Sequence, residues 1–396
     1  QVEAKGMEDE GPIIQLVSLI INKAIDSRAS DIHVEPLSNR LRVRYRVDGV
    51  CQEADVLPKQ LQDSIISRIK ILANIDISEK RRPQDGRIGL NYQDKDLDIR
   101  VSCLPSIYGE SVVMRLLEKS TILMDLKYLG FCENDYKRFH SIIKKPNGIL
   151  LITGPTGSGK TTTLYATINE LNKGDTKIIT AEDPVEYTLR GINQCEVNEK
   201  IGFNFPTILR TMLRQDPNII LVGEIRDAET ADTAIAAALT GHLVLSTLHT
   251  NDAPSAVTRL IDMGIKPFLI AASLQGIMAQ RLVRMNCTNC KEPIKYTPEQ
   301  LLEIGFEIDA LKDFTFYKGK GCKNCNNIGY RGRIGIYELL VMNETLRDMT
   351  YRMASTEEIR KAAKTSGMTS LKEDGLMKAK DGNTTLEEVF RTTGIE

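Results

Sequence analysis

Apolar and polar residues recur with two different periods in the first part of the chain. Residues 12–27 carry apolar side chains at helical spacing after a proline, which predicts a helix. The segment RLRVRYRVDGVCQEADV instead alternates between polar and apolar residues, which is typical of strands with one buried face. Its Asp48-Gly49 pair stands between two apolar runs and predicts a β-hairpin. This part of the chain is therefore expected to combine helix with antiparallel strand.

More helix and strand patterns follow the hairpin. The expected elements are a helix at about 58–74 and strands at 87–92, 96–103 and 111–117. Antiparallel strands with helices in separate blocks are typical of an α+β fold. We therefore predict a small α+β domain over residues 1–117, followed by a linker that acts as a hinge over residues 118–130.

Short, fully apolar runs replace the alternating pattern beyond the linker. Four of them, GILLITGP, KIITAEDP, NIILVGEIRD and HLVLSTLHT, are separated by segments with helical spacing. Alternating strands and helices predict a parallel sheet with helices on both faces, so we expect an α/β domain over residues 131–396. Within it we place a cysteine-containing element at 281–333 and a helical tail at 342–396, with helices at 355–366 and 384–391.

The composition weakens the case for a nucleic-acid partner. Hydrophobic residues make up 41% and charged residues 27%, as in an ordinary globular protein. Lys and Arg total 52 against 53 Asp and Glu, so the net charge is −1 and gives no electrostatic argument for nucleic acid. The sequence holds no run of 18 apolar residues, so we predict no transmembrane segment. Because the chain begins at Gln1 rather than Met, we expect it to be part of a longer protein.

The segment GPTGSGKT matches the phosphate-binding loop pattern G-x-x-x-x-G-K-[ST], known as Walker A. An apolar strand precedes it and the helical segment TTTLYATINELN follows it, which favours a phosphate site over an ordinary glycine-rich turn. The glycines let backbone N–H groups close around phosphates, and the start of the helix adds further donors. We expect Lys160 to reach the β- and γ-phosphates of ATP and Thr161 to bind Mg²⁺. The predicted nucleotide-binding residues are Gly154, Pro155, Thr156, Gly157, Ser158, Gly159, Lys160, Thr161 and Thr162.

A second part of the site is expected at the end of another strand. In NIILVGEIRD, four apolar residues form a buried strand that ends in Gly223 and Glu224. The carboxyl ends of parallel strands share one edge of a sheet, so Glu224 is expected beside the phosphate loop. There its carboxylate would polarise the attacking water or help to hold Mg²⁺. The alternative is a surface glutamate after a strand.

Two Cys-x-x-Cys pairs supply four soft metal ligands, Cys287, Cys290, Cys322 and Cys325. Zn²⁺ prefers four thiolates in a closed structural site, and the cost of closing the long loop between the pairs rises only slowly with its length. A redox role is the alternative, but the thioredoxin-like setting that it needs is absent. The charge balance weakens a third possibility, a zinc module that grips nucleic acid. The remaining cysteines are interpreted as buried, inert thiols of an intracellular protein: Cys51, Cys103, Cys132 and Cys195.

Four motifs, taken in order, resemble those of one family, the hexameric secretion ATPases that drive type IV pili and type II secretion. They are the phosphate loop GPTGSGKTTT, then TAEDPVEY, which resembles the family's Asp box, ILVGEIRD, which resembles its Walker B motif, and TGHLVLSTLHTNDA, which resembles its His box. The stretches SDIHVEP and RPQDGR resemble the domain that precedes the motor domain in this family. The resemblance covers almost the whole chain. Glu224 stands where many phosphate-loop proteins have Asp, as is usual in this family.

The resemblance implies a fold and a function. The fold would be a RecA-like motor domain preceded by a small PAS-like domain, with ATP between them. The protein would be a homohexamer that hydrolyses ATP with Mg²⁺ in the cytoplasm, at the inner membrane, where it contacts the platform protein of a pilus machine. Closure of the small domain onto the motor domain would couple hydrolysis to extension of a type IV pilus. The family's extension and secretion members carry a similar tetracysteine zinc element and its retraction members generally lack it, which favours an assembly motor.

The resemblance also implies roles for individual residues. The catalytic set is Glu224, Glu182, Asp183, Arg210, Arg214, Arg226, Arg100, Arg115, His242 and His249. Glu182 and Asp183 would lie near the Mg²⁺ and the water, the histidines would sense the γ-phosphate, and the arginines would stabilise the charge of phosphoryl transfer. The alternative for each arginine is a surface ion pair. Without the resemblance, a structural role is the more common one for each histidine. One strand face carries four more arginines, predicted to form a solvated or subunit-contact surface: Arg40, Arg42, Arg44 and Arg46.

Three other functions stay open. The closest is a type II secretion ATPase, which the shared motifs do not separate from a pilus motor. A DNA-handling RecA-like motor belongs to a different class, and the neutral charge and the lack of a basic, aromatic stacking surface argue against it. The third is a nucleotide-gated scaffold without turnover, against which Glu224 and the arginines argue.

Overall fold

The chain divides into two compact units, unit 1 over residues 1–122 and unit 2 over residues 123–396. The computed structural model describes residues 11–93, 95–118, 125–297, 299 and 314–394. The predicted hinge at 118–130 crosses the boundary between the units. Its residues 119–124 lie outside the described residues.

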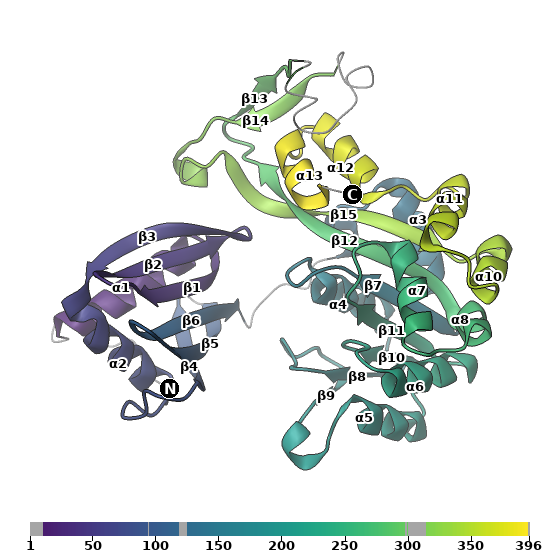
Figure 1. Cartoon of the computed structure of the whole chain (residues 1–396), viewed down its shortest axis with the longest axis horizontal. Helices are drawn as coiled ribbons and strands as arrows, with labels where there is room; N and C mark the ends of the chain where they lie inside the picture. The colour runs from purple at the N-terminus through teal and green to yellow at the C-terminus, as the bar shows by residue number, and fades with distance from the viewer. Residues whose placement is uncertain (1–10, 94, 119–124, 298, 300–313, 395–396) are drawn as a thin grey trace. The chain divides into compact units, whose positions relative to one another are not determined.

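Unit 1 is built on a six-stranded sheet in the order β3-β2-β1-β6-β5-β4, and every neighbouring pair is antiparallel (Figure 1). Its strands are β1 (Ala29–Pro36), β2 (Arg40–Val47), β3 (Val50–Pro58), β4 (Gln84–Tyr92), β5 (Lys95–Ser106) and β6 (Gly109–Glu118). The hairpin predicted at Asp48-Gly49 is confirmed, and both residues take the positive φ that its tight turn requires, +49° and +85°. Strand β1 was not predicted from the sequence.

Two helices, α1 (Pro12–Asp26) and α2 (Gln62–Leu72), pack on one face of this sheet. The strands supply the other half of the core from alternate positions, such as Val43 and Tyr45 of β2. The Tyr45 hydroxyl donates a hydrogen bond to the carbonyl of Ile20 at 2.8 Å, which ties the sheet to α1. The opposite face of the sheet is left to polar and charged side chains, as expected when only one face of an antiparallel sheet is covered.

Unit 2 is built on a seven-stranded sheet in the order β15-β12-β7-β11-β10-β8-β9. Its strands are β7 (Gly148–Thr153), β8 (Ile178–Glu182), β9 (Asn193–Glu196), β10 (Ile219–Val222), β11 (Leu243–Leu248), β12 (Leu274–Asn286) and β15 (Tyr330–Val341). All neighbours are parallel except β12 and β15. The predicted α/β fold is confirmed, but the antiparallel edge strand makes the sheet mixed rather than purely parallel.

Helices cover both faces of this sheet, which explains why its central strands are apolar throughout. In β7, Ile149 and Leu151 belong to one core, whereas Leu150 and Ile152 belong to another on the opposite face. The first core includes α5 (Phe205–Met212), α6 (Ala228–Leu239), α7 (Ala253–Asp262) and α8 (Pro267–Ser273). The second includes α3 (Glu133–Ile143) and α4 (Lys160–Leu171).

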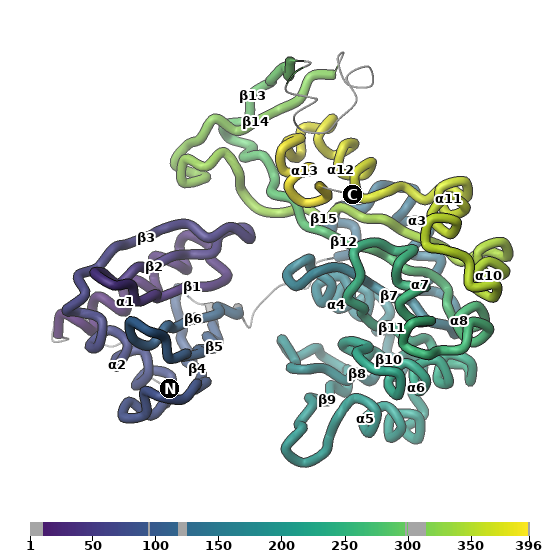
Figure 2. The backbone as a smooth tube through the Cα atoms, viewed as in Figure 1, coloured from purple at the N-terminus to yellow at the C-terminus, as the bar shows by residue number. Residues whose placement is uncertain are grey.

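The long strands β12 and β15 lead from the sheet to a two-stranded ribbon and to the C-terminal helices (Figure 2). The ribbon consists of β13 (Lys291–Ile294) and β14 (Phe316–Gly319). The predicted tail helices are confirmed as α11 (Thr356–Thr365) and α13 (Leu386–Thr393), and the structure adds α10 (Glu344–Tyr351) and α12 (Leu371–Lys380). Short 3₁₀ helices occupy Lys59–Leu61, Leu126–Tyr128, Glu199–Ile201, Leu213–Gln215 and Lys323–Cys325. None of the helices in the described ranges combines the length and apolar character that crossing a bilayer requires.

Buried polar contacts fasten the tail to β12. The side-chain amide of Asn286, the last residue of β12, donates to the carbonyls of Tyr317 at 2.9 Å, Gly382 at 3.3 Å and Thr384 at 3.1 Å. Asn286 is only 3% exposed, so these bonds replace the contacts of its side-chain nitrogen with water, whereas its Oδ1 accepts no hydrogen bond from the described residues. The residue therefore joins the ribbon and the tail to the end of the sheet.

Glu388 of α13 makes the second buried connection. It is 2% exposed and forms ion pairs with Arg284 of β12 and Arg391 of α13. Burial disfavours its charged form, but hydrogen bonds from Arg391 and Arg284 outweigh that effect and lower the pKa of Glu388 to about 2. An ionised carboxylate thus holds the last helix against the sheet.

Replacing Glu388 by glutamine is expected to loosen α13, because breaking a buried ion pair costs roughly 3–5 kcal/mol. Limited proteolysis of the full chain should cut at α13 at least about tenfold faster than in the parent protein. In the parent, ionised Glu388 stabilises the fold fully above its unfolded-state pKa of 4.5. This stabilisation is lost as the pH falls towards the folded-state pKa of about 2, so protection from the protease should weaken over that range. Glu357→Gln, at a side chain 68% exposed, is the matched control. Equal cleavage of the variant and the control would contradict the assignment.

Candidate active site

Four parallel strands end at one edge of the sheet in unit 2, and the predicted motifs follow them there. The phosphate loop follows β7, Asp183 follows β8, Glu224 follows β10 and His249 follows β11. Their parallel pairing brings the four carboxyl ends side by side. The edge therefore gathers polar groups that are far apart in the sequence.

The phosphate loop has the backbone that its glycines were expected to allow. Gly154, Gly157 and Gly159 have φ values of +147°, +79° and +87°, which side-chain-bearing residues rarely adopt. A Cβ on Gly154 would lie 2.5 Å from the carbonyl oxygen of Gln280, so only glycine fits. Gly159 caps α4, whose N-terminal N–H groups are oriented toward the loop.

The groups around the loop fit a bound phosphate. The Ser158 hydroxyl is buried and has no hydrogen-bond partner within the described part of the chain. The Lys160 ammonium donates to the loop carbonyls of Gly154 at 2.9 Å and Pro155 at 3.1 Å. Burial lowers the pKa of Lys160, and the nearby negative charge of Glu224 partly opposes that effect. Thr161 and Thr162 are exposed on the first turn of α4, where a hydroxyl is free to meet Mg²⁺.

Glu224 stands at the centre of a small charge network. Its carboxylate lies 3.1 Å from Nε2 of His249 and forms an ion pair with Arg226. Arg226 in turn lies 3.5 Å from a carboxylate oxygen of Asp183. The side chain of Glu224 is 16% exposed, so it is held by neighbours yet reaches the surface of the edge. Four of the predicted catalytic residues are thus connected in one chain of contacts, His249–Glu224–Arg226–Asp183.

Glu182 occupies a different environment from Asp183, although the two are adjacent in sequence. Its carboxylate is buried and accepts hydrogen bonds from the hydroxyls of Tyr165 and Thr180 and from the amide of Gln194. Tyr165 belongs to α4, the helix that begins at the phosphate loop. These bonds connect α4 with β8 and β9 through the buried carboxylate of Glu182, a residue that the resemblance places near the Mg²⁺ and the water.

Three other predicted residues are not brought to this cluster. His242 precedes β11 and its Nδ1 lies 2.9 Å from the carbonyl of Ala237, whereas His249 follows β11, about 20 Å away along a six-residue strand. Arg210 of α5 pairs with Glu229 of α6 at 2.7 Å, and Arg214 donates to the carbonyl of Arg210 at 3.0 Å. The apolar run between the two histidines is six residues long, which already predicts that they lie at opposite ends of one strand.

The structure adds Arg281 to the surroundings of the loop, a residue that the sequence analysis did not single out. It lies in β12, and its guanidinium donates to the carbonyls of Gln280 at 3.0 Å and Asn251 at 2.7 Å. Its charge is among those that lower the pKa of Lys160, after burial.

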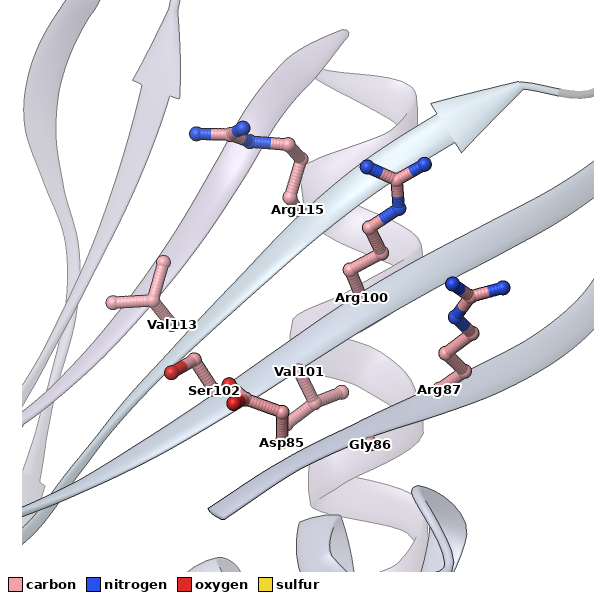
Figure 3. Close-up of a pocket in the computed structure, with 8 residues that line it drawn as sticks. All are labelled: Asp85, Gly86, Arg87, Arg100, Val101, Ser102, Val113 and Arg115. Atoms are coloured by element: carbon pink, nitrogen blue, oxygen red, sulfur yellow. The ribbon is translucent and has the colours of Figure 1, made fainter. Parts of the chain in front are cut away.

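The remaining predicted arginines lie on the charged face of the unit 1 sheet. Arg100 of β5 and Arg115 of β6 are directly paired in register and project from the same side (Figure 3). On β2, Arg42 and Arg44 contact Glu35 at 2.8 Å and 2.6 Å, and Arg46 contacts Asp31 at 3.4 Å. These β2 arginines therefore form an ion-pair network across the sheet.

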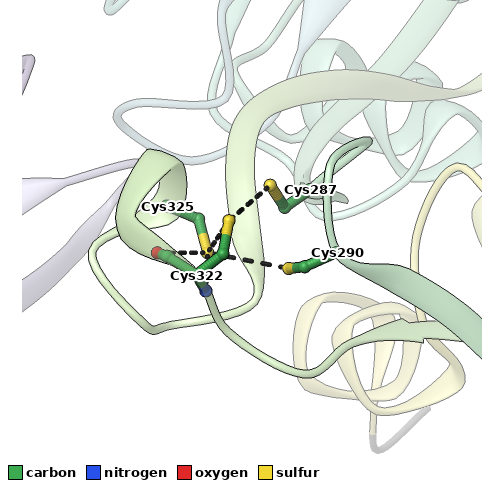
Figure 4. Close-up of side chains that lie close together, drawn as sticks. All are labelled: Cys287, Cys290, Cys322 and Cys325. Carbon is green, nitrogen blue, oxygen red and sulfur yellow. Dashed lines mark hydrogen bonds between the residues drawn. The ribbon is translucent and has the colours of Figure 1, made fainter.

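The four predicted metal ligands converge at the start of the ribbon (Figure 4). The Sγ atoms of Cys287 and Cys322 are 3.8 Å apart, those of Cys290 and Cys325 are 3.9 Å apart, and those of Cys322 and Cys325 are 3.7 Å apart. A tetrahedral zinc ion with Zn–S bonds of about 2.3 Å would separate its sulfurs by about 3.8 Å, whereas a disulfide would bring two of them to about 2.05 Å. The spacing fits a metal and excludes a disulfide.

The backbone around the cysteines suits a thiolate. The sulfur of Cys325 accepts N–H groups from Cys322 at 3.2 Å and Gly329 at 3.3 Å. Burial disfavours the charged form, but these bonds outweigh it and lower the pKa of Cys325 to about 7. Burial instead raises the pKa of Cys290 to about 12, so without a metal the cluster favours one thiolate, at Cys325. The four residues therefore offer the geometry that Zn²⁺ requires, and Cys325 offers a sulfur that readily loses its proton.

Comparisons with known proteins identify relatives that cover nearly the whole chain. The family model described as "Type II/IV secretion system protein" matches residues 6–391. The type IV pilus assembly ATPase PilB of Myxococcus xanthus is 52% identical over 97% of this chain and 68% of its own length. The type II secretion system protein E of Pseudomonas aeruginosa is 50% identical over 98% of this chain and 77% of its own length.

Solved structures of two ATPases share the fold of this chain. The pilus retraction motor PilT with bound ADP is 26% identical, with a TM-score of 0.62 over 96% of this chain and 97% of its own. The Legionella pneumophila ATPase DotB, at 21% identity, shares the fold with a TM-score of 0.68 over 97% of each chain. The predicted family is confirmed: this chain belongs to the type II/IV secretion system proteins and is an ATPase.

Proposed function

We propose that ATP and Mg²⁺ bind at the shared strand edge of unit 2 and that Glu224 activates the attacking water. The observation that carries this is the contact of Glu224 with His249 and Arg226 beside the phosphate loop. Lys160 would hold the β- and γ-phosphates and Thr161 the Mg²⁺. His249 would keep the Glu224 carboxylate oriented, and Arg226 would connect it to Asp183.

Glu182 is assigned a different role from its neighbour. Because its carboxylate accepts bonds from Tyr165 of α4 and from Gln194 of β9, it would fix the helix behind the phosphate loop against the adjacent strands. A rigid support of this kind keeps the loop in the geometry that phosphate binding needs. His242 would have a structural role at the start of β11, where its ring contacts the carbonyl of Ala237 and stabilises the turn between α6 and β11.

The arginines of unit 1 would complete the site when the two units close on ATP. We assign Arg100 and Arg115 to the nucleotide's phosphates, because phosphoryl transfer needs positive charge there. Arg210 and Arg214 would add positive charge from the motor domain within a homohexamer. Unit 2 would be a RecA-like motor and unit 1 a PAS-like domain, with residues 118–130 as the hinge between them.

The cysteine cluster would hold one structural Zn²⁺. With all four coordination positions filled by thiolates, the ion would fasten the ribbon to the ends of β12 and β15 and leave no open position for chemistry. The zinc site would thus have a structural role and take no part in catalysis.

The work of this ATPase is proposed to be extension of a type IV pilus, from the cytoplasmic side of the inner membrane and through a platform protein. The similarity to a pilus assembly ATPase over 97% of the chain supports it. The second candidate is type II secretion, supported by 50% identity to a secretion ATPase over 98% of the chain.

Deleting the gene in its source organism separates these two functions. Loss of surface pili in electron micrographs, with exoproteins still secreted, is the expected result. Restored pili with the parent gene, but not with a Glu224→Gln copy, would tie the effect to ATP hydrolysis. Normal piliation with loss of exoprotein secretion would assign the chain to type II secretion instead.

Glu224→Gln is expected to lower the ATPase turnover at least about a hundredfold, because the neutral amide cannot polarise the attacking water. Binding of a fluorescent ATP analogue should be retained, since the loop and Lys160 are unchanged. Phosphate release and fluorescence titration measure the two effects. Glu344→Gln, at an exposed glutamate on α10, is the control and should hydrolyse ATP normally. Full turnover in the Glu224 variant would remove the residue from the mechanism.

The purified chain is expected to contain about one zinc ion, as four thiolates in a closed site bind a single ion. Cys322→Ser should lose most of it, because three thiolates leave the tetrahedron open. Elemental analysis by mass spectrometry gives the stoichiometry. Cys195→Ser, on β9 and outside the cluster, should keep its zinc. Retention of a full zinc complement by the Cys322 variant would contradict the site.

A further inference from the structure

One residue of β12, Gln280, lies against both ends of the phosphate loop. Strand β12 runs parallel to β7 and pairs with it up to Ala279, the register partner of Thr153. Because Thr153 is the last residue of β7, the next residue of β12 comes beside Gly154, where the loop leaves the sheet. The sequence analysis gave Gln280 no role.

The backbone carbonyl of Gln280 faces the first glycine of the loop. A Cβ on Gly154 would lie 2.5 Å from this oxygen, which is closer than two unbonded atoms can approach. The same oxygen accepts a hydrogen bond from the guanidinium of Arg281 at 3.0 Å. The start of the loop is therefore shaped by β12 as well as by β7.

The side-chain amide of Gln280 lies against the other end of the loop. Its Oε1 accepts a hydrogen bond from the hydroxyl of Thr163, in the first turn of α4, at 2.9 Å. A Cβ on Gly159, the residue that caps α4, would lie 2.8 Å from its Nε2. The N–H of Thr163 also donates to the carbonyl of Gly159 at 3.1 Å, so the amide spans the turn that begins the helix.

Packing alone does not explain a polar side chain at this position. Gln280 is 2% exposed, and Met278 on the same face of β12 is a fully buried residue of an apolar core. A buried amide without hydrogen bonds destabilises a fold, whereas an apolar side chain of similar length would fill the space without that cost. The bond from Thr163, itself 0% exposed, offsets the burial and connects the amide to the helix that follows the loop.

We propose that Gln280 is a positioning residue that holds the phosphate loop in the shape that binds ATP. This inference rests on the proposed function, in which the loop binds the phosphates. With its carbonyl at Gly154 and its amide at Gly159, the residue fixes the two ends of the loop relative to each other. The N–H groups between them are then arranged before ATP arrives, so binding does not have to order them.

The hydrogen bonds within the loop cannot give this support throughout binding. The Lys160 ammonium donates to the carbonyls of Gly154 at 2.9 Å and Pro155 at 3.1 Å. When Lys160 turns to the β- and γ-phosphates, as the proposed function requires, these two bonds are lost. The contacts of Gln280 come from a strand outside the loop, so they persist when the nucleotide is bound.

Gln280→Met in the full chain tests this role, because methionine keeps the length of the side chain but replaces the amide with a thioether, a poor acceptor. The dissociation constant of a fluorescent ATP analogue with Mg²⁺ should rise at least about tenfold, since the unliganded loop would sample other arrangements. Turnover at saturating ATP should fall less than about threefold, because Glu224 keeps its contacts with His249 and Arg226. Equilibrium titration and phosphate release measure the two effects.

Thr163→Val removes the other partner of the same hydrogen bond and should also weaken binding of the analogue. Because the two residues act through one contact, the double variant should bind no more than about twofold more weakly than the weaker single variant. Should Gln280→Met fail to fold, the affinity of Thr163→Val decides alone.

Thr350→Val is the matched control. It removes a hydroxyl that is 1% exposed and donates to the carbonyl of Leu346 at 2.7 Å within α10. Its melting temperature should fall, as that of Gln280→Met does, because each variant loses one buried hydrogen bond. Its affinity for the ATP analogue should nevertheless match that of the parent.

Three results would overturn the inference. One is parent-like affinity in Gln280→Met, which would leave the residue a packing role only. The second is a loss of affinity in Thr350→Val as large as in Gln280→Met, which would make the effect one of general stability. The third is a double variant whose loss is the product of the two single losses, which would show that Gln280 and Thr163 act independently. If Lys160→Ala binds and hydrolyses ATP normally, the proposed function itself fails, whereas a failure at Gln280 alone leaves that function intact.

Discussion

Parallel pairing of four strands is the constraint on which the active site of this ATPase depends. A parallel sheet aligns the carboxyl ends of its strands whatever their separation in the chain, so loops from four places meet at one edge. The same pairing buries both faces of the strands, which requires helices on each side. The two hydrophobic cores of unit 2 are therefore a consequence of the architecture that builds the site, and they hold its loops on rigid supports.

The sequence predicted those parts of the fold that have strong local signals. The phosphate loop, the Asp48-Gly49 hairpin and the alternation of strands and helices each depend on residue types within a short window. The apolar run before Gly223 predicted Glu224 beside the loop, and the family resemblance added His249; the structure places these two residues in contact. The antiparallel edge strand β15 was missed, because pairing between distant strands leaves no local pattern.

The individual site residues were predicted less well, for a related reason. Adjacent residues at a strand end point to opposite sides, so Glu182 is buried among donors while Asp183 is exposed, and a motif does not show which is which. His242 and His249 share a motif but lie at opposite ends of one strand. Gln280 comes to lie beside Gly154 only through strand register, which long-range pairing decides.

The buried amide of Asn286 has a consequence for the order in which the protein assembles during synthesis. It immediately precedes the first cysteine of the cluster, yet one of its hydrogen-bond acceptors, Thr384, lies 98 residues further along the chain. A ribosome releases the chain from the N-terminus onwards, so β12 emerges long before the carbonyls that satisfy its last residue. The junction at the first cysteine of the cluster is therefore completed only when nearly the entire chain has been made, and a chain that stops short of the tail lacks two of the three carbonyls that accept from this amide.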